Sequence, residues 1–281
     1  MREIALGQYY QTSSIVHSTD ARVKLLISIA YLVMVFFVET YIGFGVLAVC
    51  FLLTVFASRV PLFKVLKSLK VILFLAFFTF LMTMLFYGGA KKTVVWEWWI
   101  IKIYEGQLYA CGLVLLRLVF LVLGPTMLTF TTTPVELTDG LEWLLKPLAL
   151  IGIPIHSGAL VMSMTLRIIP NLIDETDRII NAQKSRCADF DSRNIFKRAK
   201  AMIPILVPLI ASSFRKADEL ADAMDSRCFV GAKNRTRMRK LRFTWRDPIA
   251  LILFAAEFTV ILWLKFNFFP FVDLSTVGWI V

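Results

Sequence analysis

The chain has 281 residues, of which 58% are hydrophobic, and a formal net charge of +11. Its mean hydropathy of +0.72 excludes an ordinary soluble domain and indicates a polytopic membrane protein. In such a protein lysine and arginine usually set the topology and contact anionic lipid, so we expect membrane lipid and no nucleic acid as a partner. Four scattered cysteines and two histidines predict neither a disulfide framework nor a metal site.

Five apolar runs predict five membrane-spanning helices. They lie at about 25–40, 41–57, 71–87, 108–130 and 249–265. The loop 58–70 carries four basic residues and no acid, whereas the loop 88–105 mixes both signs and holds three tryptophans suited to the lipid headgroups. Because positive charge is enriched on the cytoplasmic side, the N-terminus is predicted inside the cell and the C-terminus outside it.

This topology divides the chain into three parts. Residues 1–130 form an N-terminal transmembrane region with four spans, residues 131–247 lie in the cytoplasm, and residues 248–281 form the last span and an outer tail. Seven basic residues between 233 and 246 are typical of a segment that contacts phospholipid. The predicted fold class is all-α, with about five transmembrane helices and three amphipathic helices in the cytoplasm.

The first amphipathic helix has a clear start signal. Thr133, Pro134 and Glu136 supply a hydroxyl N-cap, a proline at the first helical position and a glutamate three residues after the cap. An apolar stripe follows and ends at the break over residues 152–154. The stripe comprises Leu137, Leu141, Leu144 and Leu148.

Two further amphipathic helices are predicted at about 157–187 and 208–228. The second of these bears too many charges opposite its apolar stripe for a bilayer core, so these helices lie along the membrane or on one another. One stripe comprises Met162, Leu166, Ile169, Ile173, Ile180 and Cys187, and the other comprises Ile210, Phe214, Ala217, Ala221, Met224 and Cys228.

Both helices end in the same tripeptide, Ser185-Arg186-Cys187 and Ser226-Arg227-Cys228, 41 residues apart. Each follows an alanine three residues before its serine, Ala182 or Ala223. Since one residue turns a helix by about 100°, both arginines point away from the stripes. A single arginine at a helix end is usually explained by the helix dipole. The repetition favours a paired docking role, in which each guanidinium binds carboxylates or carbonyls of a partner.

The sequence contains no recognisable catalytic motif. Residues 88–93 resemble a nucleotide-binding loop only in their letters, so we expect no enzyme and no catalytic residue. Within the predicted spans, Glu257 is a candidate partner for the deeply placed Arg117, while Glu39 and Lys265 are expected to reach the interface. A self-contained secondary transporter with a site around Arg117 and Glu257 stays open as an alternative. A membrane enzyme acting on lipid is another, although no catalytic cluster supports it.

Together these features resemble the transmembrane (T) subunits of energy-coupling factor (ECF) transporters, bacterial and archaeal importers of vitamins and transition-metal ions. The resemblance covers nearly the whole chain. The segment from Gly7 to Lys24 is similar to the family's opening segment, although Gln11-Thr12 and Ser18-Thr19 depart from it. The helix start at Thr131–Pro134 resembles that of the first coupling helix. The second coupling helix is matched by Arg167, Pro170, Ala182 and Arg186, and the third by Pro208, Ala217, Leu220, Ala221, Ala223 and Arg227.

The resemblance implies partners for these helices. In that family an arginine between two small residues ends the second and third coupling helices, and each inserts into a groove on one of two ABC-type ATPases. Here serine and cysteine stand where alanine and glycine are common. The stripes would face a separate substrate-binding (S) subunit in the plasma membrane of a prokaryote. This chain would bind no cofactor, because ATP and Mg²⁺ are used by the partner ATPases.

Overall fold

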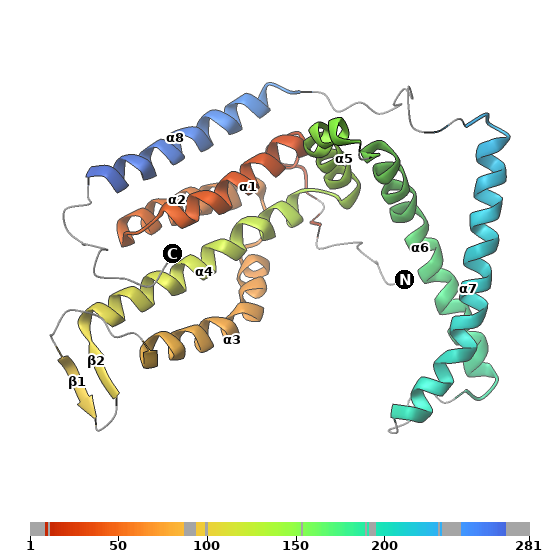
Figure 1. The fold of residues 1–281 in the computed structure, drawn as a ribbon, viewed down its shortest axis with the longest axis horizontal. Coiled ribbons are helices and arrows are strands. Elements are labelled where there is room, and N and C mark those ends of the chain that lie inside the picture. Colours follow the sequence, from red (N-terminus) through yellow and green to blue (C-terminus); the bar gives the residue numbers. More distant parts are fainter. Residues whose placement is uncertain are drawn as a thin grey trace. The chain divides into compact units, whose positions relative to one another are not determined.

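The computed structural model describes residues 9–10, 12–86, 94–98, 101–152, 154–188, 190, 195–229, 231 and 243–267. Helices dominate this part of the chain (Figure 1). The elements in chain order are α1 (Ala21–Phe37), α2 (Tyr41–Ser58), α3 (Leu62–Phe86), β1 (Val94–Trp98), β2 (Ile101–Tyr104), α4 (Glu105–Thr131), α5 (Pro134–Leu145), the 3-10 helix η1 (Lys146–Ile151), α6 (Ile155–Ser185), α7 (Ile195–Asp225) and α8 (Arg246–Asn267).

The described residues form two compact units. The span unit comprises the described residues up to Gly140 and those from Phe243 onward. The α6–α7 unit comprises the described residues from Leu141 to Gly231. Helix α5 contributes to both units, because the division falls inside it.

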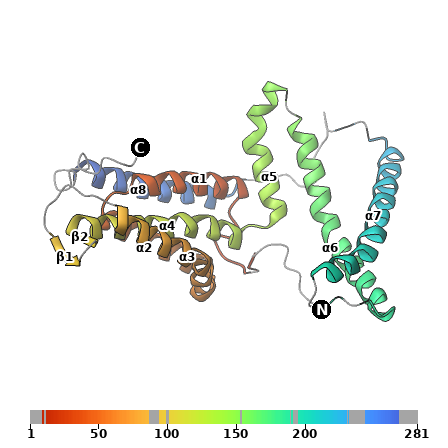
Figure 2. The same ribbon diagram turned by 60° about the horizontal axis from the view of Figure 1, so that its bottom comes forward.

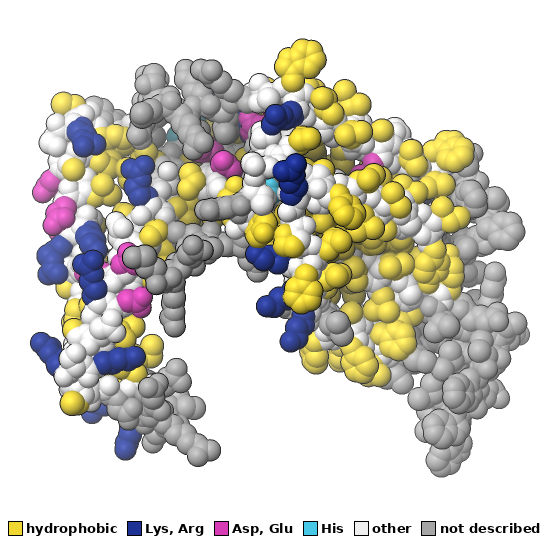
Figure 3. Space-filling view, turned by 180° about the vertical axis from the view of Figure 1, so that it is seen from behind, with side chains coloured by type: hydrophobic (Ala, Val, Ile, Leu, Met, Phe, Trp, Pro, Cys, Tyr) yellow, Lys and Arg dark blue, Asp and Glu magenta, His cyan; other side chains and the backbone are white. Residues whose placement is uncertain are grey.

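The span unit is built from helices that pack side by side. Helices α1, α2, α4 and α8 run alongside one another (Figures 1 and 2), and α3 packs against α4. In the core, the rings of Phe44 and Phe120 stack with their centroids 5.8 Å apart. Hydrophobic side chains also cover much of the outer surface (Figure 3), which is typical of helices that face lipid. The buried core comprises Tyr31, Met34, Val35, Val38, Phe44, Leu47, Val55, Val60, Val65, Phe120, Leu123, Met127, Phe130 and Ile261.

The structure confirms a helical membrane protein. Among the described residues, three helices are long and apolar enough to cross a membrane, within α2, α4 and α8. A fourth is α3 if its halves Leu62–Lys70 and Phe74–Met82, bent by 53°, form one span. Helix α1 has 17 residues and so extends about 25 Å, slightly less than the roughly 30 Å of a bilayer core. The count of five spans therefore stays a prediction.

The first two predicted spans are separate helices, as expected. Val38 adopts an extended backbone that ends α1. The Thr40 side chain then accepts a hydrogen bond from the Gly43 amide at 3.2 Å and caps the start of α2. The first span was predicted to end at residue 40, three residues beyond Phe37, the last residue of α1.

A short antiparallel hairpin was not predicted. Strand β1 pairs with β2 inside the loop expected outside the cell, with Trp98 opposite Ile101 and Glu97 opposite Lys102. Both strands are rich in β-branched and aromatic residues, which favour extended backbone. The loop therefore contains regular structure, while the rest of the described chain keeps the expected helical class.

In the α6–α7 unit the two long helices pack on each other. Helix α6 begins within two residues of the predicted start, and its His156 Nδ1 lies 2.6 Å from Oε1 of Glu142 in α5. The predicted start of α7 near Pro208 was wrong, because the helix begins at Ile195. Pro204 and Pro208 lie inside it, where each removes a backbone donor. The added turns place Ile205 on a half-buried side of the helix.

Candidate functional site

Helix α5, which was predicted to be the first coupling helix, begins with the predicted capping box. The Glu136 amide donates to Thr133 Oγ1 at 3.3 Å, and the Thr133 amide donates to Glu136 Oε2 at 3.4 Å. These reciprocal bonds satisfy backbone donors that the helix itself leaves free. Of the predicted stripe, Leu144 is half-buried and the other members are exposed: Leu137, Leu141 and Leu148.

The start of α5 is held by a buried lysine from α1. Lys24 Nζ donates to the carbonyl oxygens of His17 at 3.0 Å and Thr131 at 2.9 Å. Thr131 is the last residue of α4, and Thr133 caps α5 two residues later. Burial, together with the nearby Lys24 ammonium, lowers the pKa of His17 below its ordinary value. The opening segment that resembles the family's therefore fixes the point at which α5 leaves α4.

Asp247 belongs to the same polar cluster and was missed by the sequence analysis. Its carboxylate is completely buried and accepts hydrogen bonds from the Asp20 amide at 2.8 Å and the Thr244 amide at 2.6 Å. Lys24 interacts electrostatically with both acids. The signal was present in the sequence, because Thr244 and Asp247 have the spacing of a capping box just before an apolar run. This carboxylate joins the starts of α1 and α8.

The first repeated tripeptide forms a tight helix end. Arg186 caps α6, and Cys187 has a left-handed backbone with φ of 62°. The Cys187 amide donates to the Lys184 carbonyl at 3.0 Å, and the Ala188 amide donates to the Gln183 carbonyl at 3.1 Å. This pair of bonds defines a Schellman motif.

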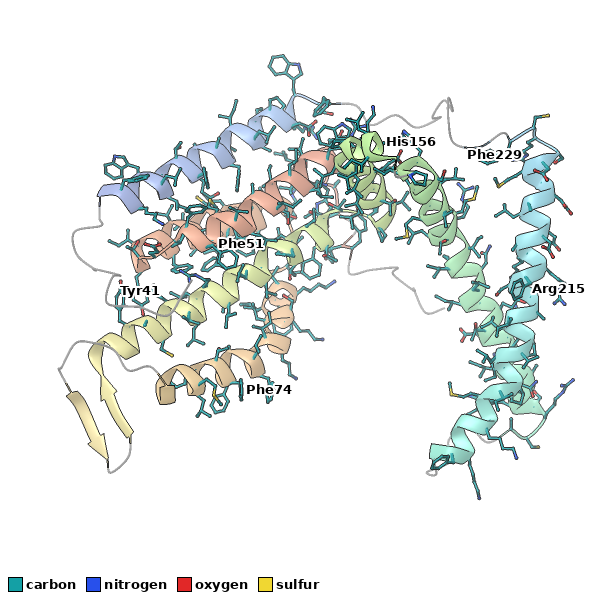
Figure 4. The ribbon with its side chains drawn as sticks, in the orientation of Figure 1. Tyr41, Phe51, Phe74, His156, Arg215 and Phe229 are labelled. Atoms are coloured by element: carbon teal, nitrogen blue, oxygen red, sulfur yellow. The ribbon has the colours of Figure 1, made fainter. Side chains whose placement is uncertain are left out.

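The second tripeptide repeats this structure at the end of α7. Cys228 has φ of 54°, its amide donates to the Asp225 carbonyl at 2.9 Å, and the Phe229 amide donates to the Met224 carbonyl at 3.1 Å. Figure 4 labels Phe229 at this end of the helix. Arg186 and Arg227 are both exposed at matching positions. The sequence repeat is therefore also a repeat of local structure.

The flanking residues of the two arginines are exposed. Each serine hydroxyl bonds back to a helix carbonyl, Ser185 to Asn181 at 3.1 Å and Ser226 to Ala223 at 3.0 Å. Both cysteines were predicted to close the packed stripes, and this was wrong, because both are exposed. The left-handed backbone at each cysteine turns the chain off the helix, so these side chains leave the stripe. The exposed residues at the two ends are Ala182, Ser185, Arg186 and Cys187, and Ala223, Ser226, Arg227 and Cys228.

Helices α6 and α7 use only part of the predicted stripes to pack on each other. On α7 the half-buried side carries Leu209, Leu220 and Met224, and Ser212 is buried there. Phe214, in contrast, is 69% exposed within this chain. Residues of the predicted α6 stripe that are half-buried are Leu166, Ile169, Ile173 and Ile180, and the exposed stripe residues of the two helices, besides the two cysteines, are Met162, Ile210, Phe214, Ala217 and Ala221.

The expected pairing of Arg117 with Glu257 was wrong. Arg117 Nη2 donates to the carbonyl oxygen of Val38, the residue that ends α1, at 3.0 Å. The Glu257 carboxylate instead interacts with the Cys50 thiol. An arginine inside a span can donate to a free carbonyl at a helix end, and the sequence gives no hint of such a partner. The two charged residues therefore have separate partners, and no direct contact between them supports the alternative of a secondary-transporter site around Arg117 and Glu257.

Comparison with known proteins places these features in one family. The CbiQ family model, described as cobalt transport protein, matches residues 12–238. The energy-coupling factor transporter transmembrane protein EcfT of Ruminiclostridium cellulolyticum is 42% identical over 270 residues, covering 96% of this chain and all of that protein. EcfT of Clostridium kluyveri is 44% identical, covering 89% of this chain and 92% of its own length. EcfT of Bacillus subtilis is 39% identical, covering 91% and 97%.

The match extends across the span unit, the capping box of α5 and both arginine-tipped helix ends. Identity near 40% over almost the full length of both proteins cannot arise from a shared apolar composition alone. The chain therefore belongs to the EcfT/CbiQ family of energy-coupling factor transporter transmembrane subunits.

Proposed function

We propose that this chain couples two cytoplasmic ABC-type ATPases to a membrane-embedded S subunit that binds a vitamin or a metal ion. The observation that carries the proposal is the repeated helix end, which presents an exposed arginine twice in the same local structure. Two equal ends suit two similar partners, and a guanidinium can bind carboxylates or carbonyls through two parallel hydrogen bonds. ATP and Mg²⁺ belong to the partner ATPases in this scheme, and the chain acts without a catalytic residue.

The exposed apolar side chains of the coupling helices support the contact with the S subunit. Leu150 and Ile151 at the end of η1 are 91% and 78% exposed. Contiguous exposed apolar surface usually marks a protein or membrane contact. The residues proposed to contact the S subunit are the exposed Leu137, Leu141, Leu148, Met162, Phe214, Ala217 and Ala221 and the half-buried Leu144, Leu166, Ile169 and Ile173.

In this proposal the chain works as a transmitter of force. Closure of the ATPases on ATP would displace both arginine-tipped helices, and the S subunit would reorient with the surface on which it packs. A coupling of this kind transfers only as much free energy as the partners' states differ in affinity. The affinities at the two helix ends and at the apolar surface are therefore the quantities to measure.

Affinity purification from native membranes tests this proposal. The tagged wild-type chain is expected to bring down two ATPases and a small membrane protein that binds substrate. The variant Phe214→Asp should keep the ATPases and lose the membrane protein at least tenfold, because burying an unpaired carboxylate in an apolar contact costs a few kcal/mol. Phe214→Leu is the matched control. Recovery of no ATPase with the wild type would refute the proposal, and an undiminished S subunit with Phe214→Asp would refute its apolar contact.

We also propose that the N-terminus is cytoplasmic and the C-terminus outside, supported by the positive charge of loop 58–70. In a variant whose four cysteines are replaced by alanine, a cysteine introduced at Ser275 should react with a membrane-impermeant thiol reagent in intact cells. A cysteine introduced at Arg237 should stay unlabelled until the cells are broken. Both positions lie outside the described residues. Labelling in the opposite order would contradict this orientation.

A further inference from the structure

A second repeat accompanies the arginines, in the contact between α6 and α7. The Glu175 carboxylate on α6 accepts hydrogen bonds from the Ser212 hydroxyl and the Lys216 ammonium on α7. Lys216 and Ser212 thereby hold the pKa of the Glu175 carboxyl below its ordinary value. Ser212 is only 7% exposed, so this contact lies within the packed side of the two helices.

The two charged residues occupy equivalent positions in the repeat. Glu175 and Lys216 are 41 residues apart, as are Arg186 and Arg227. Each arginine therefore follows its charged residue by 11 positions, which corresponds to about 16 Å along a helix axis. We call the helix ends that carry Arg186 and Arg227 the docking ends. The two helices thus touch at the same distance from each docking end.

The two docking ends lie on opposite sides of this contact. Figures 1 and 2 show α7 crossing α6, with the C-terminal ends of the two helices at opposite ends of the pair. Figure 4 labels Arg215, the residue next to Lys216, part of the way along α7. An opposite charge at each equivalent position favours this crossing, because a register shifted by one turn, about 5.4 Å, would separate the carboxylate from the ammonium.

We infer that Glu175 and Lys216 are positioning residues, which keep the crossing point of α6 and α7 at equal distances from the two docking arginines. The helix segment between the crossing and each arginine acts as an arm. Force applied at either arginine then acts through an arm of the same length. This inference rests on the proposed function, because the arms matter only if each arginine holds an ATPase. Loss of the pair should leave both helix ends intact while the helices change register, so ATPase binding should persist and coupling should fall.

The test is a charge exchange in the complete transporter. Glu175→Lys and Lys216→Glu each place like charges at the crossing, and each is expected to lower transport per ATP hydrolysed by roughly tenfold, within the usual range of coupling energies. The double variant Glu175→Lys/Lys216→Glu restores opposite charges and should recover coupling to within about twofold of wild type. The neighbouring exposed Asp174→Lys makes the same charge change outside the contact and is the matched control.

The outcomes separate this inference from the proposed function. A wild-type chain without ATPases would refute the proposed function itself. Two outcomes would refute the positioning role alone. In one, both single variants couple as well as the wild type. In the other, the double variant is as defective as the single variants. If Glu175→Lys reduces membrane insertion, Glu175→Gln replaces it, because the amide keeps an acceptor for Ser212 and removes only the charge. Undiminished coupling with this variant would then overturn the inference.

Discussion

Replacing both Arg186 and Arg227 by glutamate is expected to remove almost all co-purifying ATPase while membrane insertion stays normal. Each acid would meet a groove that accommodates a cation, at a cost of roughly 2 to 5 kcal/mol per site by analogy with buried charge pairs. Since about 1.4 kcal/mol is a tenfold change in affinity, two such sites abolish detectable binding. The helix ends themselves should survive, because both arginines are exposed and their Schellman bonds use only backbone groups.

The measurement is a pull-down of both ATPases, alongside ATP-dependent uptake, for the wild type, each single variant and the double variant. A single variant should leave a partly assembled and poorly coupled complex, since the other helix end still holds its subunit. Arg178→Glu, an exposed arginine earlier on α6, is the control for a reversed charge on this helix. If the double variant retained both ATPases and full transport, the two arginines would be ordinary solvated helix ends.

The two helix ends were predictable in position but not in detail. A repeated Ser-Arg-Cys after two amphipathic segments located the arginines, and both are exposed as expected, although the cysteines beside them do not belong to the packed stripes. The left-handed backbone at Cys187 and Cys228 was not predicted, because glycine is the residue that usually signals it. A cysteine at this position has some backbone strain, because its side chain disfavours the left-handed region.

Contacts between residues distant in sequence account for most of what the sequence analysis missed. Glu39 and Lys265 were expected to reach the membrane interface, and the ion pair that they form at 2.9 Å was not predicted, since 226 residues separate them. Arg117 donates to the backbone carbonyl of Val38 and not to an acid. Local patterns such as caps, stripes and apolar runs predict elements, because they act within a few residues. Which side chains and carbonyls pair between helices depends on which helix ends meet. Local patterns in a single sequence do not show this.

The cluster at Asp247 yields the last expected result. Asp247→Ala should lower the free energy of unfolding by roughly 2 to 4 kcal/mol, since it leaves the amides of Asp20 and Thr244 without their acceptor. The change also removes a negative charge that interacts with the buried Lys24. Lys24 in turn holds the carbonyl of Thr131 just before α5, so this loss should loosen the first coupling helix as well.

Thermal unfolding of the purified protein in detergent measures this effect. Asp247→Asn should be nearly as damaging, because its amide nitrogen would face one of the two backbone donors and leave that donor unpaired. Asp218→Ala, at an exposed position on α7, removes the same carboxylate where it has no such role and should change the midpoint temperature little. A midpoint for Asp247→Ala equal to that of wild type would show that the junction of α1 and α8 does not depend on this carboxylate, and that the buried bonds contribute nothing to holding the first coupling helix.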